Sequence, residues 1–193
     1  MKGVDAVTDR DLLHALRERR SRPRLVAPAP GPGELAELLA VAAGAPDHGR
    51  LRPWRFVVVD ESARGPLGEA FAAAHAERAP EATPEQLEHS RTKPLRAPLV
   101  VVVVASPVAH AKVPQWEQHA SAAAVAYGLV LAADLAGFGA IWRTGWYGDA
   151  PKVRAHLGLT AEETVTGWVY LGTPAGSAPA PRPNLPLPVT YLR

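Results

Sequence analysis

Three polar clusters, far apart in the chain, contain the residue types that hold a planar, anionic cofactor. The segment Trp142-Arg143-Thr144-Gly145 follows a short apolar run, so it would end a strand with a cation and free backbone N–H groups. Arg19-Arg20-Ser21 and the turn Ala45-Pro46-Asp47-His48 are the other two clusters. A phosphate needs charge-assisted donors, and arginine supplies a fork of them beside a serine hydroxyl. The clusters therefore suit a ligand built from a phosphate and an aromatic ring.

Each cluster also has a purely structural interpretation, which the sequence leaves open. Arg19-Arg20-Ser21 could be a helix C-terminus whose cations complement the helix dipole. His48 taken alone is more often a loop or core histidine than a ligand, and Asp47 is best explained as the hydrogen-bonding residue of its own turn. Tryptophans normally pack in cores, and we keep that interpretation for Trp54. Arg143 is harder to explain in this way, because a cation after a buried strand needs an anion or solvent.

Composition and charge exclude several classes of protein. The 193 residues suffice for one compact domain with a sizeable core. The chain has no cysteine, which excludes disulfides, thiolate metal sites and cysteine nucleophiles. The formal net charge is only +2 and the basic residues are scattered, so no footprint for nucleic acid is visible. No metal site is expected, because His75, His110 and His119 lack ligand spacing with any carboxylate.

Neither a secretory signal nor a membrane span is expected. The segment from Met1 to Arg20 is charged throughout and has no apolar h-region. The longest apolar stretch runs from Ala97 to Ala105, whereas a helix needs about 20 residues to cross a bilayer. The sequence therefore predicts a soluble, cytoplasmic protein that binds no membrane.

Apolar periodicity and turn residues predict an alternation of helices and short strands. Helices are expected at Asp9–Arg20 (with Thr8 as its cap), Gly33–Gly44, Ser62–Arg78, Pro84–Arg91, Pro114–Ala136 and Ala150–Leu157. Strands are expected at Trp54–Val59, Pro98–Ala105, Ala140–Trp142 and Thr164–Leu171. This alternation indicates a layered α/β or α+β domain.

Two strands and one helix should form the core. Val100 to Val104 are five consecutive valines and make the clearest central strand. Trp54–Val59 is apolar almost without a break, so we expect it to be buried on both faces. The helix Pro114–Ala136 is nearly apolar from Ala120 onward and should be the buried spine.

The two ends of the chain differ from this domain. The tail after Pro174 is rich in Pro, Ala and Gly, so it cannot form a core and suits an extended arm laid over a neighbour. We therefore divide the chain into an N-terminal extension (1–8), one domain (9–174) and a Pro-rich C-terminal arm (175–193).

Five segments, in order, carry a resemblance to a known family. They are Arg19-Arg20-Ser21, Ala45-Pro46-Asp47-His48 with Arg52-Pro53-Trp54, Val113-Pro114-Gln115-Trp116-Glu117-Gln118, the stretch from Gly137 to Gly145, and Tyr170-Leu171-Gly172-Thr173-Pro174. Each is weak alone, but together the chain from Leu16 to Pro174 resembles the nitroreductase family of FMN-dependent oxidoreductases, in its small single-domain branch.

The resemblance implies a fold and an assembly. The fold would be α+β, a three-layer α/β/α sandwich around a central mixed, mainly antiparallel sheet. Two chains would form an intertwined homodimer with one FMN in each of two interface clefts. Pro114–Ala136 would then lie at the dimer core, and the Pro-rich arm would embrace the partner subunit.

The resemblance also assigns residues to the flavin. Arg19, Arg20 and Ser21 would grip FMN through phosphate and pyrimidine contacts, and His48 would reach it from the other subunit. Trp142, Arg143 and Thr144 would line the ring, with a backbone N–H near Thr144 facing N5. No protein residue would be catalytic, since the flavin performs the redox chemistry. Members of the family commonly carry Arg where Gly44 stands; Arg50 or Arg52 could substitute, or one flavin contact is absent.

The activity implied is that of an NAD(P)H:acceptor oxidoreductase. Hydride would pass from the nicotinamide to FMN and then, in a ping-pong cycle, to a nitroaromatic, quinone or activated alkene. A flavin-binding carrier or interaction protein with little turnover is the alternative. Reductive dehalogenation or oxidative flavin fragmentation ranks last, because those branches carry extra lid segments. No glycine-rich dinucleotide turn is present to choose between NADH and NADPH.

Overall fold

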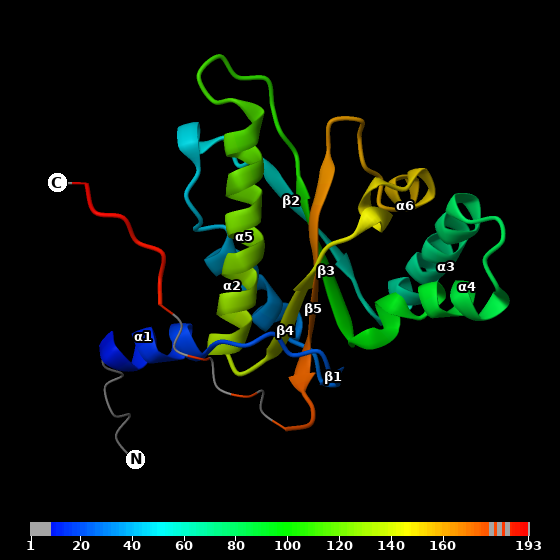
Figure 1. The fold of residues 1–193 in the computed structure, drawn as a ribbon, viewed down its shortest axis with the longest axis horizontal. Helices are drawn as coiled ribbons and strands as arrows, with labels where there is room; N and C mark the ends of the chain where they lie inside the picture. Colours follow the sequence, from blue (N-terminus) through cyan, green and yellow to red (C-terminus); the bar gives the residue numbers. More distant parts are fainter. Residues whose placement is uncertain (1–8, 178–179, 181–182, 184–185, 193) are drawn as a thin grey trace.

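The computed structural model describes residues 9–177, 180, 183 and 186–192, and the structural statements below refer to these (Figure 1). Its helices are α1 (Asp9–Glu18), α2 (Pro32–Ala42), α3 (Glu61–Arg78), α4 (Pro84–Arg91), α5 (Gln115–Leu135) and α6 (Pro151–His156). Its strands are β1 (Leu25–Val26), β2 (Trp54–Val59), β3 (Leu99–Ala105), β4 (Gly139–Arg143) and β5 (Thr164–Pro174). Short 3₁₀ helices are η1 (His48–Arg50), η2 (Lys93–Arg96) and η3 (Trp146–Asp149).

Every helix and strand expected from the sequence is present, with small differences at the ends. The expected first helix ends early, at Glu18 rather than Arg20. Residues 1–8, including the expected cap Thr8, lie outside the described residues. The two-residue strand β1 was not predicted.

The strands form one sheet in the order β1-β5-β3-β2, with β4 also paired to β5. All of these pairings are antiparallel. Strand β5 is longer than its neighbours. Along one edge it carries β3, and along the other edge β4 (Gly139 opposite Gly172) and then β1 (Val26 opposite Thr173). Strand β4 ends with Trp142 and Arg143, and Thr144 follows it, so this predicted cluster lies on the β4 side of β5.

Helices cover both faces of this sheet. Strand β3 is buried along its whole length, and its valines alternate between two cores. Val100, Val102 and Val104 pack on the side of α3 and α6, whereas Val101 and Val103 pack on the side of α2 and α5. Figure 1 shows the same arrangement, with α2 and α5 on one side of the strands and α3, α4 and α6 on the other. The α+β class and the three-layer α/β/α organisation are thus confirmed.

Strand β2 corrects one expectation. It pairs only with β3, so it is an edge strand, and Val58 is 43% exposed. Trp54 and Phe56 pack against the α5 side while Val57 and Val59 pack against the α3 side. The prediction of burial on both faces therefore holds only in part: each face contacts a core, but most of this edge strand is half-buried, and a continuous apolar run does not reveal where the covering helices end.

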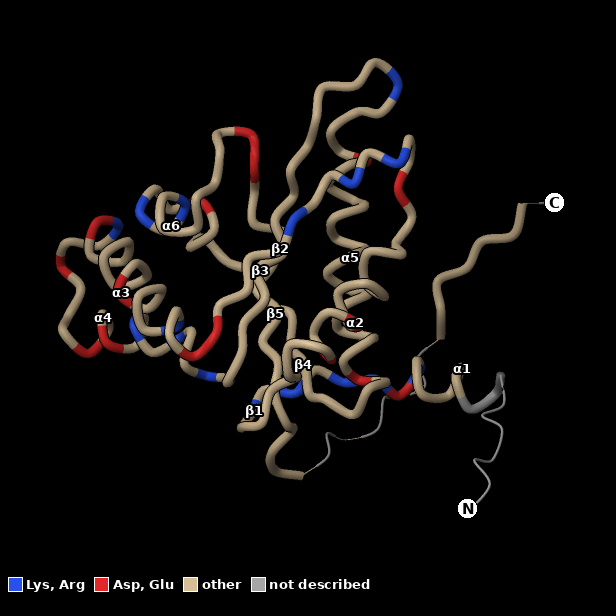
Figure 2. The backbone as a smooth tube through the Cα atoms, turned by 180° about the vertical axis from the view of Figure 1, so that it is seen from behind, with Lys and Arg blue, Asp and Glu red and all other residues tan. Residues whose placement is uncertain are grey.

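Helix α5 is buried on one side only. Leu129 and Val125 are fully buried, whereas Trp116, Tyr127 and Leu135 are exposed. The arm residues 186–192 are exposed as well and stand off the domain on the side of α1 and α5 (Figures 1 and 2). No described helix combines the length and the apolar character that a bilayer span requires.

Candidate functional site

A cavity of about 420 Å³ opens where β4 ends. Three cations line it: Lys93 and Arg96 from η2, and Arg143 from β4. Thr144 and Gly145 complete its polar rim. Its remaining walls are the aromatic rings of Phe71, Trp146, Tyr147, Trp168 and Tyr170. No lining residue is acidic, so the cavity has a net positive lining.

The turn after β4 creates this cavity. Gly145 has φ +147°, a backbone conformation that side-chain-bearing residues rarely adopt. The chain then enters η3 at once, which brings Trp146 and Tyr147 beside the sheet. Tyr147 stacks on both Trp146, with ring centroids 4.0 Å apart, and Phe71 of α3, at 4.3 Å. The aromatic wall is therefore a packed stack, which fixes the shape of the cavity.

The cations lie against aromatic rings. The Lys93 Nζ atom lies 4.6 Å from the centroid of the Tyr147 ring. The guanidinium carbon of Arg143 lies 5.9 Å from the centroid of Tyr170. Such contacts hold a cation in place while leaving its N–H donors able to bind an anion.

The phenol of Tyr170 keeps its proton at neutral pH. Burial raises its pKa above the ordinary value, while the nearby Arg143 and Arg96 act in the opposite direction. The cavity thus contains no anion of its own to neutralise its cations.

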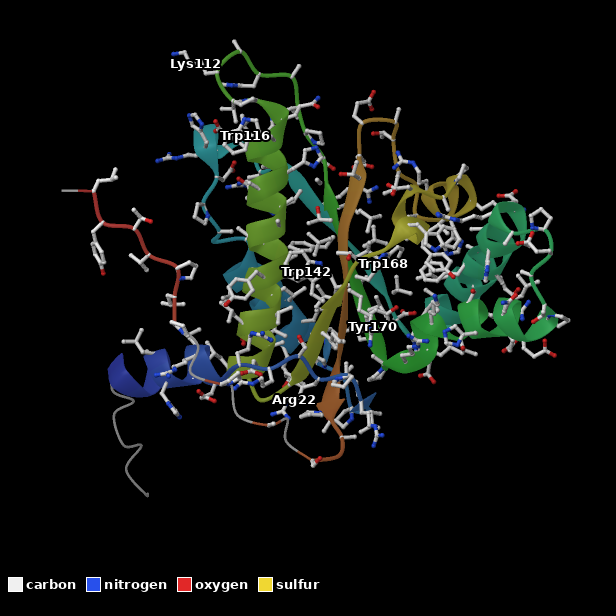
Figure 3. All side chains as sticks on the ribbon, viewed as in Figure 1. Arg22, Lys112, Trp116, Trp142, Trp168 and Tyr170 are labelled. Atoms are coloured by element: carbon white, nitrogen blue, oxygen red, sulfur yellow. The ribbon has the colours of Figure 1, made fainter. Side chains whose placement is uncertain are left out.

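Of the predicted ring-lining residues, the structure brings together Arg143 and Thr144 but not Trp142. Successive side chains of a strand point to opposite faces. The Trp142 indole lies on the α5 side of the sheet, whereas Trp168 and Tyr170 lie on the other side (Figure 3). Its Nε1 donates to the carbonyl of Thr166 at 3.3 Å. A Cβ at Gly167 would lie 1.8 Å from that same nitrogen, so glycine is required beneath the indole.

Arg19, Arg20 and Ser21 follow α1 and lie at the other end of β4. The backbone N–H of Arg22 donates to the carbonyl of Ala140 at 2.9 Å, which ties this segment to the edge of β4. The four steps along β4 from Gly139 to Arg143 span roughly 13 Å at the usual rise of a strand. The two predicted clusters are therefore joined by one short strand.

The side chain of Arg20 turns back onto its own helix. Its Nη1 donates to the carbonyl oxygens of Glu18 at 3.0 Å and Arg19 at 3.1 Å, and its Nη2 contacts the Glu18 carboxylate at 3.3 Å. This is the helix-terminus role that the sequence left open for the cluster.

A second cavity, of about 510 Å³, lies beside Ser21. Arg22 and Arg24 line it from the same segment, and Ala175, Gly176 and Ser177 line it from the start of the arm. Figure 2 shows the basic residues gathered along the chain between α1 and β1. Two arginines and two serine hydroxyls are a suitable donor set for a phosphate.

His48 lies away from both cavities. Its Nδ1 is 2.6 Å from the Glu117 carboxylate of α5, and the imidazole is 59% exposed. It borders a third hollow, of about 330 Å³, with Trp116 and the outer side of α5. The carboxylate of Asp47 accepts a hydrogen bond from the backbone of Arg52 at 2.7 Å, which confirms its predicted role in the turn.

Four basic residues that line the two cavities were not predicted from the sequence. Lys93 and Arg96 occur at positions i and i+3 directly before the central strand, in a 3₁₀ turn that places them on one side. That basic pair at the start of a buried strand was the available signal. Arg22 and Arg24 alternate along an extended segment next to the predicted cluster, and no motif distinguished them.

Among the described residues, no group of three or more His, Cys, Asp or Glu side chains could hold a metal ion. The site is therefore built from cations, hydroxyls and aromatic rings. Such a lining can bind a planar, anionic ligand.

Solved structures share this fold. A nitroreductase-like family protein from Bacillus cereus superposes with a TM-score of 0.76 at 24% identity, covering 96% of this chain and 94% of that one. A nitroreductase with bound FMN from Bacteroides fragilis gives 0.75 at 22% identity, covering 95% and 99%. At these identities the likeness concerns the fold.

Sequence relatives are closer. The chain is 36% identical to "Putative NAD(P)H nitroreductase YdjA" of Escherichia coli over 184 residues, covering 94% of this chain and 98% of that protein. It is 36% identical to "Putative NAD(P)H nitroreductase" of Haemophilus influenzae over 164 residues, covering 84% and 88%. The model of the nitroreductase family matches residues 16–173. The chain belongs to the nitroreductase family.

Proposed function

We propose that this protein is an FMN-dependent NAD(P)H oxidoreductase that reduces nitroaromatics, quinones or similar acceptors by ping-pong hydride transfer. The observation that carries the proposal is the aromatic cavity with three cations and no acid at the end of β4. The FMN in the Bacteroides fragilis relative and the names of the sequence relatives support it.

The residues present fit FMN. Lys93, Arg96 and Arg143 would hold the electron-rich pyrimidine edge of the ring, and the aromatic walls would exclude water from it. The cavity at Ser21, Arg22 and Arg24 would hold the phosphate. The role predicted for Arg19 in that phosphate site remains part of the proposal, whereas the donors of Arg20 contact its own helix.

When bound, FMN supplies the hydride-accepting and hydride-donating chemistry. The residues of the chain tune it by charge. Three cations beside the pyrimidine edge favour an anionic reduced ring over a neutral oxidised one. A backbone N–H near Thr144 would donate to N5, where negative charge and hydride meet.

The proposal includes a homodimer. Trp116, Tyr127 and Leu135 of α5 are 70%, 48% and 51% exposed and follow one side of the helix, a stripe of apolar surface that a second copy would cover. His48 borders this stripe, so it would contribute to the flavin site of the partner as predicted. The exposed arm residues Leu187, Tyr191 and Leu192 would pack on the partner in the same assembly.

An absorption spectrum of the purified protein tests the cofactor, and anaerobic titration with NADPH and NADH tests the activity. We expect yellow protein with one FMN per chain, bleached by a nicotinamide and restored by menadione or nitrofurazone. Yellow protein that neither nicotinamide bleaches would indicate the flavin-binding carrier instead. Colourless protein that takes up no added FMN would contradict both functions.

A further inference from the structure

Behind the aromatic wall of the cavity runs a chain of three hydrogen-bonded side chains. The hydroxyl of Tyr147 donates to Ser90 Oγ at 2.8 Å. The Nδ1 of His75 lies 2.7 Å from the same oxygen. These residues come from η3, α4 and α3, so three separate segments converge on one serine hydroxyl.

Burial changes along this chain from the cavity to the surface. Tyr147 lines the cavity and is 7% exposed, and Ser90 is 1% exposed. His75 is partly exposed, with its ring edge-on to Trp146 at 6.2 Å between centroids. The three side chains thus run from the partly exposed His75 to Tyr147, which forms part of the cavity wall.

The hydrogen-bond pattern fixes the direction of each donor. The Ser90 hydroxyl donates to the carbonyl of Gln86 at 3.1 Å. Since it has only one proton, it must accept from both Tyr147 and His75, which places a proton on Nδ1 of the imidazole. A rotation of the Ser90 hydroxyl toward Tyr147 would reverse the chain, with each donor then pointing toward the cavity.

We propose that His75, Ser90 and Tyr147 are the path by which a proton reaches the cavity during reduction of the acceptor. This inference rests on the function proposed above. In that half-reaction a quinone takes a hydride from reduced FMN and a proton from Tyr147, giving the hydroquinone and oxidised FMN. Tyr147 regains its proton from Ser90, Ser90 from the imidazolium of His75, and His75 from water.

Two cations lie over aromatic rings beside the path, and two carboxylates, Glu77 and Asp149, border the hollow next to Trp146. The ammonium of Lys93 lies over the Tyr147 ring at 4.6 Å, and the guanidinium carbon of Arg78 lies 4.6 Å from the centroid of Trp146, the ring that contacts His75. Tyr147 is the one residue of the path that lines the cavity, so His75 and Ser90 act through it.

Measuring the two half-reactions separately distinguishes a failure of the proton path from a failure of the proposed function. Hydride transfer from NAD(P)H to oxidised FMN consumes no proton, so anaerobic bleaching in Ser90→Ala and His75→Gln, which change residues outside the cavity lining, should keep the wild-type rate. Reoxidation by menadione should slow on the order of 10²-fold, the usual contribution of a positioned acid. Failure of bleaching in the wild type would refute the function; normal reoxidation in both variants would refute the path alone.

Matched variants control for loss of structure. His156→Gln changes an exposed imidazole on α6, outside the cavity, and should reoxidise at the wild-type rate. His75→Ala leaves a space at the surface end of the path, so added imidazole should restore its reoxidation rate. A merely structural histidine would not respond to imidazole in this way, and absence of rescue would count against proton transfer.

The apoprotein offers a readout independent of turnover. In protein labelled with [ζ-¹³C]tyrosine, the Cζ signal in an equal mixture of H₂O and D₂O reports exchange of the hydroxyl proton. The signal of Tyr147, assigned by its loss in Tyr147→Phe, should be averaged in the wild type and split in His75→Gln. Equal exchange in both proteins would overturn the proposal.

Discussion

The carboxylate of Glu163 and the guanidinium of Arg55 form a two-point ion pair across the sheet. Nε of Arg55 donates to Oε1 at 2.6 Å and Nη2 donates to Oε2 at 2.8 Å. Glu163 also accepts from Ser106 Oγ and from the backbone of Thr160, so every lone pair of a 7%-exposed carboxylate is used. The pair ties the edge strand β2 to the start of β5.

This pair makes stability depend on pH. Its hydrogen bonds lower the pKa of Glu163 from 4.5 to about 2, with Arg55 as the largest cause. A lowered pKa in the folded state stabilises the fold above pH 4.5, and this contribution is lost as the pH falls from 4.5 toward 2. Urea denaturation at neutral and acid pH should show a smaller acid-induced loss of stability in Glu163→Gln than in the wild type.

At neutral pH the same substitution should cost about 1.5–3 kcal/mol of unfolding free energy, the range for hydrogen bonds to charged groups. Glu162→Gln is the matched control, since Glu162 is the exposed neighbour. An equal loss in both variants would show that the ion pair contributes nothing specific.

The cation-lined cavity predicts which substitutions weaken FMN binding. Arg143→Ala, Arg96→Ala and Lys93→Ala should each weaken FMN binding roughly 10- to 100-fold, since each removes a charge-assisted donor. Lys152→Ala is the control, because Lys152 pairs with Glu77 at the surface. Isothermal titration of the apoprotein measures these affinities. Undiminished FMN binding in Arg143→Ala would mean that the ring lies elsewhere.

The cations should also set the potential of bound FMN. Removal of Arg143 takes positive charge away from an anionic reduced ring, so the midpoint potential should become more negative than in the wild type. Spectroelectrochemical titration measures this shift. A potential unchanged in Arg143→Ala and Lys93→Ala would contradict the charge argument even if affinity fell.

Arg20 and Ser21 should have different roles: Arg20 in the stability of α1 and Ser21 in FMN binding. Arg20→Ala should lower the stability of α1 by about 0.5–1 kcal/mol, because its donors contact the last carbonyls of that helix, and should leave FMN affinity unchanged. Ser21→Ala should weaken FMN binding, because Ser21 lines the cavity shared with Arg22 and Arg24. If FMN affinity instead fell in Arg20→Ala and stayed unchanged in Ser21→Ala, the phosphate role predicted for Arg20 would be supported.

The stripe on α5 predicts the oligomeric state. Tyr127→Arg should shift the protein from dimer to monomer in light scattering, because it places a charge in an apolar interface. Loss of the dimer should also release FMN, since His48 would no longer reach the partner's site. Val58→Arg, at an exposed valine of the edge strand, should remain dimeric. A wild-type monomer with full FMN content would contradict the assembly.

The sequence predicted the elements well and the site in part. Long apolar runs such as Val100 to Val104 predict a buried strand, whereas the two residues of β1 are too few to show a hydrophobic periodicity. Trp142 was grouped with Arg143 because they are neighbours in sequence, but strand alternation sends them to opposite faces. Lys93 and Arg96 reach the cavity only through the pairing of β3, β5 and β4. Such convergence depends on tertiary structure, which no local pattern contains.

The cavity walls come from α3, η2, β4, η3 and β5, segments separated by much of the chain. None of them can assemble the cavity before β4 has docked on β5, so FMN has nothing to recognise in an early folding intermediate. The supply of FMN would then leave the amount of folded polypeptide unchanged. It would change only the fraction of folded chains that contain FMN.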